Sequence, residues 1–260
     1  MTSKLNVLTY NIASGIDAHG HFNMDNIAET IKNTKADIIG LQEVDVHWDQ
    51  RSNYINEVKF LEEKLNMFAY FAPIYVEKSL DQEEARKFGL LVLSKYPIVK
   101  AINHKMTRLS TQEVEPQREL RPGFPEVIIN VNGIEILFFV AHLDYRTDPT
   151  IREIQVGEIL DIISPDRSNV ILVGDFNAEP DDVELQPLFK RFQDLGDSVN
   201  QLIGNTFPVP EPTKRIDYIL TSHDFQILNT EVMKSNASDH YPVVATLETA
   251  GKIGESTRMN

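Results

Sequence analysis

The chain has 260 residues, and its 25 lysines and arginines against 39 aspartates and glutamates leave a formal net charge of −14 at pH 7. Proteins that bind long nucleic acids non-specifically neutralise phosphates with Lys and Arg, so this charge balance disfavours such a function. The hydrophobic share of 42% and the charged share of 25% are typical of globular proteins, which excludes the disordered and fibrous classes.

The chain contains no cysteine, which excludes a disulfide framework and any thiolate metal site. Its first ten residues, MTSKLNVLTY, lack the basic start and the apolar run of a signal peptide. No stretch approaches the roughly 18 consecutive apolar residues that a membrane-spanning helix needs. We therefore expect a cytoplasmic protein without a transmembrane segment.

Apolar runs of strand length recur along the chain. Several of these runs do not alternate between apolar and polar residues, which is typical of central strands covered on both faces. The predicted strands are Leu5–Tyr10, Asp37–Leu41, Phe88–Leu93, Val127–Val131, Ile134–Val140, Val170–Val173, Ile216–Leu220 and Val243–Leu247.

Helical periodicity appears between these runs. The predicted helices carry three apolar stripes: Met24, Ile27, Ala28 and Ile31; Val58, Leu61 and Leu65; and Ile151, Ile154, Ile159, Leu160 and Ile163. The third helix is introduced by Asp148 as its N-cap and Pro149 at its first position.

The dipeptide Asn132-Gly133 between two apolar runs predicts a tight hairpin, so antiparallel pairing is present. Mixed parallel and antiparallel strands interleaved with a few helices predict an α/β layered fold. The chain shows no internal repeat and no shift in composition. We therefore expect one domain over residues 1–248, followed by a polar tail over residues 249–260.

Polar residues stand at the ends of the apolar strands, where layered α/β folds gather functional sites. Taken singly, each has a plain structural interpretation, because an Asp after a strand more often caps a turn and a lone His is more often structural. Asp217 is stronger, since a carboxylate between Ile216 and Tyr218 should be buried and paired. The strand-end residues are Asn11, Gln42, Glu43, His142, Asp144, Asp175, Asn177, Asp217, Asp239 and His240. Together they favour phosphoryl chemistry with oxygen ligands for Mg²⁺ or Mn²⁺.

The order and spacing of these motifs resemble the endonuclease/exonuclease/phosphatase family. The matching segments are Asn11, Gln42-Glu43, Glu119-x-Arg121, His142-Leu143-Asp144, Gly174-Asp175-Phe176-Asn177, Arg215-Ile216-Asp217-Tyr218 and Ser238-Asp239-His240. The resemblance covers residues 5–248. It implies a single catalytic domain built as a four-layer α/β sandwich, in which two mixed β-sheets pack face to face with helices on the outside.

The resemblance also implies a set of roles. Glu43 would be the principal metal ligand, with Asp239 and Asn11 nearby, and the ion would act as a Lewis acid on the phosphate. Asp175 would orient and deprotonate the attacking water, while Asn177 would donate a hydrogen bond to the developing charge on the phosphoryl oxygens.

The two histidines would flank the phosphate, each held by a carboxylate that favours the charged imidazolium. Asp217 would hold His240, and Glu119 would hold His142.

Further residues are candidate substrate contacts. They are Arg121, Trp48 and Phe207, with an apolar filling role for Trp48 as the alternative. His19 and His21 could resemble a metal site together with Asp17, but we favour a solvated loop or a substrate contact because no third soft ligand is in evidence.

The sequence thus predicts a magnesium- or manganese-dependent phosphodiesterase or phosphatase acting on a small or lipid-headgroup substrate. A nuclease acting on DNA or RNA is the alternative, disfavoured by the net charge. A non-catalytic binding protein that keeps only the fold is a third hypothesis, and it is weakened because no catalytic position is lost. The oligomeric state stays open.

Overall fold

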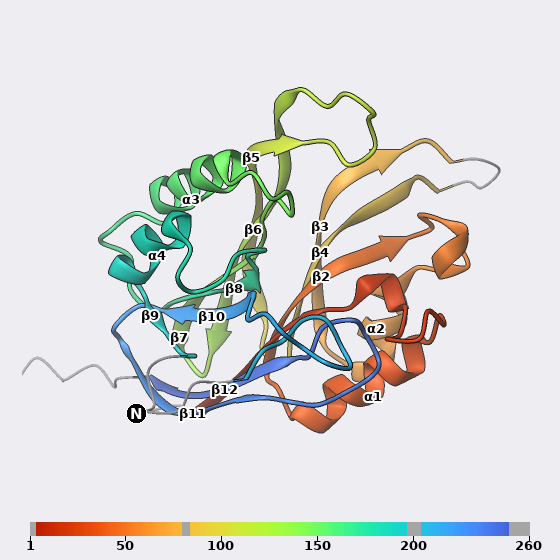
Figure 1. Ribbon diagram of the computed structural model, residues 1–260. Coiled ribbons are helices and arrows are strands. Elements are labelled where there is room, and N and C mark those ends of the chain that lie inside the picture. Colours follow the sequence, from red (N-terminus) through yellow and green to blue (C-terminus); the bar gives the residue numbers. More distant parts are fainter. Residues whose placement is uncertain (1–3, 80–83, 197–203, 250–260) are drawn as a thin grey trace, which may run out of the picture.

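The structure is a computed structural model that describes residues 4–79, 84–196 and 204–249. Two mixed six-stranded sheets pack face to face, with helices outside both of them (Figure 1). This is the four-layer α/β sandwich that the family resemblance implies. Most of the predicted polar tail lies outside the described residues, because only Thr249 belongs to them, as the last residue of a strand.

The first sheet has the strand order β11-β12-β1-β2-β4-β3. Its central pair β1 and β2 is parallel, and its other neighbours are antiparallel. The strands are β1 (Lys4–Asn11), β2 (Ile38–Val46), β3 (Phe68–Glu77), β4 (Arg86–Ser94), β11 (Phe225–Val232) and β12 (Val243–Thr249).

The second sheet has the order β5-β6-β7-β8-β10-β9, with β7 and β8 as its parallel pair. The strands are β5 (Ile98–Leu109), β6 (Arg118–Val131), β7 (Ile134–His142), β8 (Val170–Asp175), β9 (Gln193–Asp194) and β10 (Asp217–Thr221). The predicted hairpin joins β6 to β7, and Asn132 and Gly133 both adopt the positive φ that its tight turn requires.

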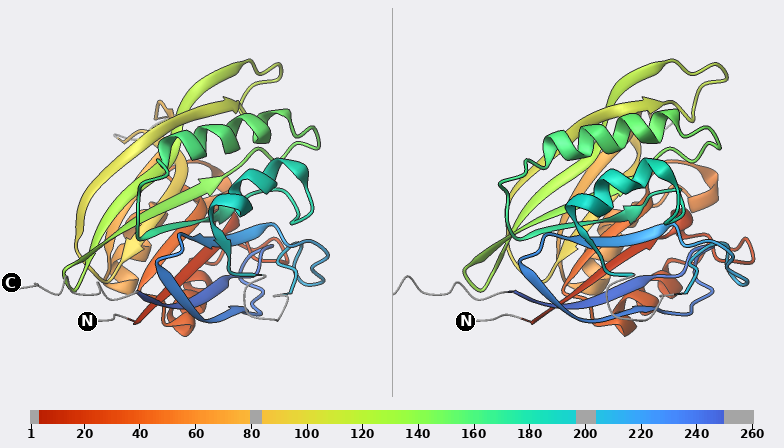
Figure 2. Two further views of the ribbon diagram at one scale, coloured as in Figure 1. Left: turned by 90° about the vertical axis from the view of Figure 1, so that its left-hand side faces the viewer. Right: turned by 60° about the vertical axis from the view of Figure 1, so that its left-hand side comes forward.

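Three apolar clusters hold the four layers together. One lies between the sheets and includes Val92, Phe138 and Val173. The others join α1 (Met24–Thr34) and α2 (Glu57–Leu65) to the first sheet, and α3 (Thr150–Ile162) and α4 (Gln186–Arg191) to the second. Figure 2 shows α3 and α4 side by side on the outer face of the second sheet.

The three predicted helices are confirmed. α3 begins at Thr150, so Pro149 occupies the N-cap position that was predicted for Asp148. Asp148 still contributes to the start of the helix, since its carboxylate accepts hydrogen bonds from the backbone nitrogen and the hydroxyl of Thr150. In the part of the chain that the structure describes, no helix has the length and apolar character needed to cross a bilayer.

All eight predicted strands are present, and each is an inner strand of its sheet. The sequence analysis missed β3, β5, β9 and β11, which are the four edge strands. An edge strand borders solvent and mixes exposed with buried positions, as β11 does, so it shows no continuous apolar run. The short helix α4 was missed as well.

Candidate active site

Neighbouring strands of the second sheet bring the predicted catalytic residues to one end of the strands, which we call the catalytic edge. His142 ends β7 opposite Asp175, which ends the parallel strand β8. The antiparallel strand β10 begins at the same edge, so that Asp217 pairs with Asp175. Gly174 permits this close packing: a Cβ there would lie 2.0 Å from the Ala141 carbonyl oxygen, and its φ is +154°.

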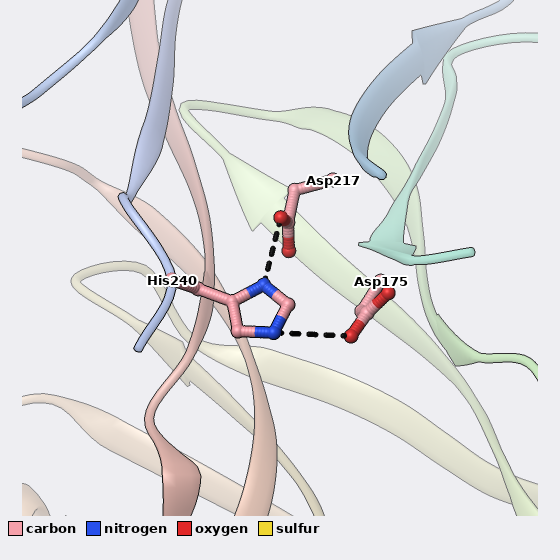
Figure 3. A group of neighbouring side chains, drawn as sticks. All are labelled: Asp175, Asp217 and His240. Atoms are coloured by element: carbon pink, nitrogen blue, oxygen red, sulfur yellow. Dashed lines mark hydrogen bonds and ion pairs between the residues drawn. The ribbon is translucent and has the colours of Figure 1, made fainter. Parts of the chain in front are cut away.

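His240 lies between two buried carboxylates (Figure 3). Its Nδ1 is 2.9 Å from Oδ2 of Asp217, and its Nε2 is 3.7 Å from Oδ2 of Asp175. Asp217 is fully buried, as the sequence predicted for a carboxylate between Ile216 and Tyr218. The geometry assigns the Nδ1 proton to the bond with Asp217, which leaves Nε2 directed toward the catalytic edge.

The two active-site histidines differ in protonation. Burial alone would lower the pKa of His240, but Asp217 and Asp175 outweigh it and raise the pKa to about 10. Burial lowers the pKa of His142, and the attraction of Asp175 only partly opposes it. His240 is therefore cationic and His142 neutral at pH 7. The expectation that both rings are charged is wrong for His142, because it has no carboxylate bound as closely as Asp217 is to His240.

Asp175 is the centre of the hydrogen-bond network. Its Oδ1 accepts from the backbone nitrogen of Asn177 at 2.9 Å, and its Oδ2 accepts from Nδ2 of Asn11 at 3.1 Å. Burial raises its pKa, with Asp217 adding to the effect and the two histidines opposing it. A buried carboxylate with a raised pKa is a stronger proton acceptor than an exposed one.

Two functional positions have left-handed backbone. Glu43 has φ +57° and Asn177 has φ +50°, values that are uncommon for residues other than glycine. Glu43 lies where the register between β2 and β4 shifts, so an irregularity in the strand redirects its side chain. Asn177 donates one amide hydrogen to the Leu143 carbonyl at 3.1 Å, and its second amide hydrogen is available to a ligand in the cavity.

Asn11 joins the two sheets at the site. From the end of β1 its Nδ2 donates to Glu43 as well as to Asp175, both at 3.1 Å, while its Oδ1 accepts from the backbone nitrogen of Ala13. Asn11 therefore orients two carboxylates from different sheets. To ligate a metal, its oxygen would have to serve an ion in addition to Ala13, so that role stays a prediction.

Glu43 and Asp239 provide carboxylate oxygens suited to a hard cation. Both line one cavity, and Glu43 contributes to raising the pKa of Asp239, although burial is the larger cause. A divalent cation between them would relieve this repulsion. The ligand atoms of Asp175, Asp217 and His240 also lie within 4.8 Å of one another. We favour the first pair because a protonated imidazole has no lone pair to offer.

The site opens into a cavity of about 520 Å³. It collects residues from both sheets and from the loops above them. The lining residues are Glu43, Trp48, Asp49, Arg51, Phe88, Thr111, Gln112, His142, Tyr145, Asp175, Asn177, Phe207, Ile216, Asp239 and His240. The predicted substrate contacts Trp48 and Phe207 are among them, and the Phe207 ring lies 4.7 Å from the His240 ring.

The prediction that Glu119 holds His142 is wrong. Glu119 is half exposed and pairs with Arg121 at 2.8 Å, and the only carboxylate within ion-pair distance of His142 among the described residues is that of Asp175. Arg121 itself is bound by both Glu119 and Glu113, and it does not line the main cavity. The sequence pair Glu119-x-Arg121 thus forms a local ion pair, because alternate residues of a strand face the same side.

Other singled-out residues are structural. Asp144 pairs with Arg146. Asp17 accepts hydrogen bonds from the backbone nitrogens of His19 and His21, which makes a local turn. Sequence reasoning missed several cavity residues: Arg51, Thr111, Gln112 and Tyr145. Arg51 could have been found from its place just after Trp48, whereas Thr111 and Gln112 lie in the β5–β6 connection and carry no motif.

Known proteins share this fold. A structure of an endonuclease/exonuclease/phosphatase from Beutenbergia cavernae is 21% identical with a TM-score of 0.74, covering 95% of this chain and 72% of that chain. A mannosyl-6-phosphatase from Bacteroides thetaiotaomicron is 18% identical (TM-score 0.71; 94% and 99% covered). Beta toxin from Staphylococcus aureus with bound magnesium ions is 18% identical (TM-score 0.64; 94% and 99% covered). The model of the Endonuclease/Exonuclease/phosphatase family matches residues 8–240, so the chain belongs to this family.

Proposed function

We propose that this protein hydrolyses phosphoesters by direct attack of water, with Mg²⁺ or Mn²⁺ as its cofactor. The observation that carries the proposal is the convergence of Glu43 and Asp175 from two sheets on one cavity, where Asn11 hydrogen-bonds to both, next to a histidine held between two buried carboxylates. A protein that kept only the fold would have no need to bury these charges together.

The reaction divides among the residues as follows. Asp175 accepts the proton of the attacking water, and the hydrogen bonds from Asn11 and Asn177 fix the direction of its carboxylate. Cationic His240 stabilises negative charge that develops on the phosphoryl oxygens. The free amide hydrogen of Asn177 and neutral His142 supply further donors on the same side of the cavity.

Glu43 and Asp239 are the residues that would hold the cation. When bound, a divalent cation supplies Lewis-acid polarisation of the phosphoryl group. The magnesium ions bound in the related beta toxin structure support this choice of metal.

The substrate is a small phosphoester or a lipid headgroup. A cavity of about 520 Å³ falls within the range of small-molecule sites, roughly 300–1,000 Å³. The related mannosyl-6-phosphatase supports a small phosphorylated substrate. The charge of −14 opposes long nucleic acids, since phosphate neutralisation by basic residues dominates their binding.

The test is release of 4-nitrophenol from 4-nitrophenyl phosphate and from its bis ester, with Mg²⁺ or Mn²⁺ and with EDTA. Plasmid DNA and phospholipid substrates are assayed in parallel. We expect metal-dependent turnover of at least one small ester, and loss of it in Asp175→Asn. Asp37→Asn is the matched control, because Asp37 pairs with Lys95 just before β2 begins, away from Glu43 near its other end. Absence of turnover on every phosphoester would refute the proposal, and rapid plasmid cleavage alone would favour the nuclease.

A further inference from the structure

Arg108 is a buried arginine without a carboxylate partner. Three arginines are buried in the described part of the chain, and two of them are paired: Arg152 with Glu184 and Arg215 with Asp194, each at 2.7 Å. Arg108 is only 9% exposed, yet no described carboxylate lies within 4.0 Å of its guanidinium nitrogens. Buried charges are rare unless they are paired, so Arg108 calls for a functional explanation.

The hydrogen bonds of Arg108 leave part of its guanidinium unused. One terminal nitrogen donates to the His142 carbonyl at 3.2 Å and the other to the Gly123 carbonyl at 2.9 Å. Its Nε is buried without a partner, and five N–H donors are available on the group. Burial lowers the pKa of Arg108, and the more distant charges of Tyr75, Asp144 and Glu158 oppose this only in part. Two backbone carbonyls position the group but do not neutralise its charge.

Arg108 lines a second, smaller cavity of about 60 Å³ that adjoins the catalytic cavity. The two cavities share Phe88, Thr111, His142 and Tyr145 as wall residues. Because a water needs about 10–15 Å³ of such volume, the small cavity has room for about four to six water-sized atoms, which is the size of a carboxylate or a phosphate. Asp144 also lines it, but both of its carboxylate oxygens accept hydrogen bonds from Arg146.

We propose that the cavity beside Arg108 binds a second acidic group of the substrate. The substrate class is then a small phosphoester that carries a carboxylate or a further phosphate close to the scissile phosphate. His142 connects the two positions, because its backbone carbonyl binds Arg108 and its ring faces Asp175. This inference rests on the proposed phosphoesterase activity and specifies its substrate.

Matched substrate pairs test the proposal on the wild-type protein with magnesium. Glycerol 3-phosphate and 3-phosphoglycerate differ by a carboxylate, and fructose 6-phosphate and fructose 1,6-bisphosphate differ by a phosphate. We expect kcat/KM to be about tenfold or more higher for the doubly acidic member of at least one pair, as a charged hydrogen bond to Arg108 allows. The pair that shows the preference identifies the acidic group. Equal kcat/KM within both pairs overturns the proposal.

Substitution of Arg108 separates substrate binding from a structural role. In Arg108→Met the preference ratio should fall to about one, mainly through KM, and Arg108→Lys should keep part of it because it retains the charge. Arg167→Met is the control, since Arg167 already pairs with Glu126 at 2.7 Å and should keep the ratio. An equal loss for both members of a pair in the two Arg108 variants would mean that Arg108 only supports His142, and the proposal would be wrong. If Arg108→Met does not fold, the preference ratios of Arg108→Lys and of the wild-type protein test the proposal.

A binding measurement keeps the two proposals distinguishable. Calorimetric titration of Asp175→Asn in magnesium with 3-phosphoglycerate and with glycerol 3-phosphate, and likewise with the two fructose phosphates, does not depend on turnover. Tighter binding of a doubly acidic compound without hydrolysis of any ester would support the Arg108 site and refute the proposed function. Hydrolysis of all four compounds with no preference in rate or binding would support the proposed function and refute the Arg108 site.

Discussion

Asp217→Asn tests how the buried carboxylate beside His240 contributes to catalysis. The change keeps the size of the side chain and removes its charge, 2.9 Å from Nδ1 of His240. The folded protein raises the His240 pKa from 6.5 to about 10, and this difference of about 3.5 pH units corresponds to about 5 kcal/mol in favour of the imidazolium. Asp217 makes the largest of the three carboxylate contributions, ahead of Asp175 and Asp239, and adds a hydrogen bond, so its loss should remove more than half of this stabilisation.

The expected consequence is a large loss of turnover at neutral pH. We expect kcat to fall by about a hundredfold to ten-thousandfold, since a neutral ring stabilises phosphoryl charge poorly. The dependence of kcat on pH should also change in the variant. Wild-type His240 stays protonated below about pH 10, whereas in the variant the lowered pKa makes kcat decline as pH rises through the neutral range.

The assay is kcat and KM for a chromogenic phosphoester across the pH range, with Asp37→Asn as the control for removal of a partly buried carboxylate elsewhere. Thermal unfolding of each variant checks that the fold is kept. A variant that retains kcat within about tenfold of wild type at neutral pH, with an unchanged pH profile, would refute the role given to Asp217.

Glu43→Gln should weaken Mg²⁺ binding in a calorimetric titration without unfolding the protein, and equal affinities would remove Glu43 from the metal site. Gly174→Ala should lower the free energy of unfolding by about 3 kcal/mol or more in urea titrations, because its Cβ would meet the Ala141 carbonyl at 2.0 Å. Gly157→Ala in α3 is the control: its Cβ meets nothing within 4 Å, and it should gain up to about 1 kcal/mol. Burial, reinforced by Asp45, raises the pKa of Glu57 well above 4.5, so wild-type stability should decline as pH rises from 4.5 through that higher value. Glu57→Gln should therefore gain stability relative to wild type as pH rises above 4.5, and a difference independent of pH would contradict this reasoning.

The sequence motifs predicted most of the residues that meet at the catalytic edge. Asp175, Asp217 and His240 do converge, as do Asn11 and Glu43 from the first sheet. The partner of His142 was predicted wrongly because Glu119 was assigned from a sequence pattern alone. In the structure that pattern lies at the exposed start of β6, where Glu119 finds a cation two residues away and has no reason to reach the buried edge.

The electrostatics of the site depend on distances between segments that are remote in sequence. His142 ends β7 and His240 lies just before β12, yet the second is cationic and the first neutral. The difference arises because Asp217 binds His240 at 2.9 Å, while the only described carboxylate within ion-pair distance of His142, that of Asp175, lies 3.7 Å away and only partly opposes the effect of burial on the His142 pKa. The unpaired charge of Arg108 likewise depends on contacts between segments that are remote in sequence. Nothing in the local sequence distinguishes Arg108 from Arg152, which pairs with Glu184.

Local patterns in the sequence were sufficient to predict the eight inner strands, the Asn132-Gly133 turn and the role of Asp148 at the start of α3. Each depends on residues close together in the chain: a continuous apolar run, a dipeptide that tolerates positive φ, or a carboxylate two residues before the amide that it binds. The four edge strands, the cavity residues Thr111 and Gln112, and the protonation of the two histidines became apparent only from the three-dimensional arrangement. These features arise from burial and from charges brought together by sheet pairing and by packing of the sheets, and local patterning records neither.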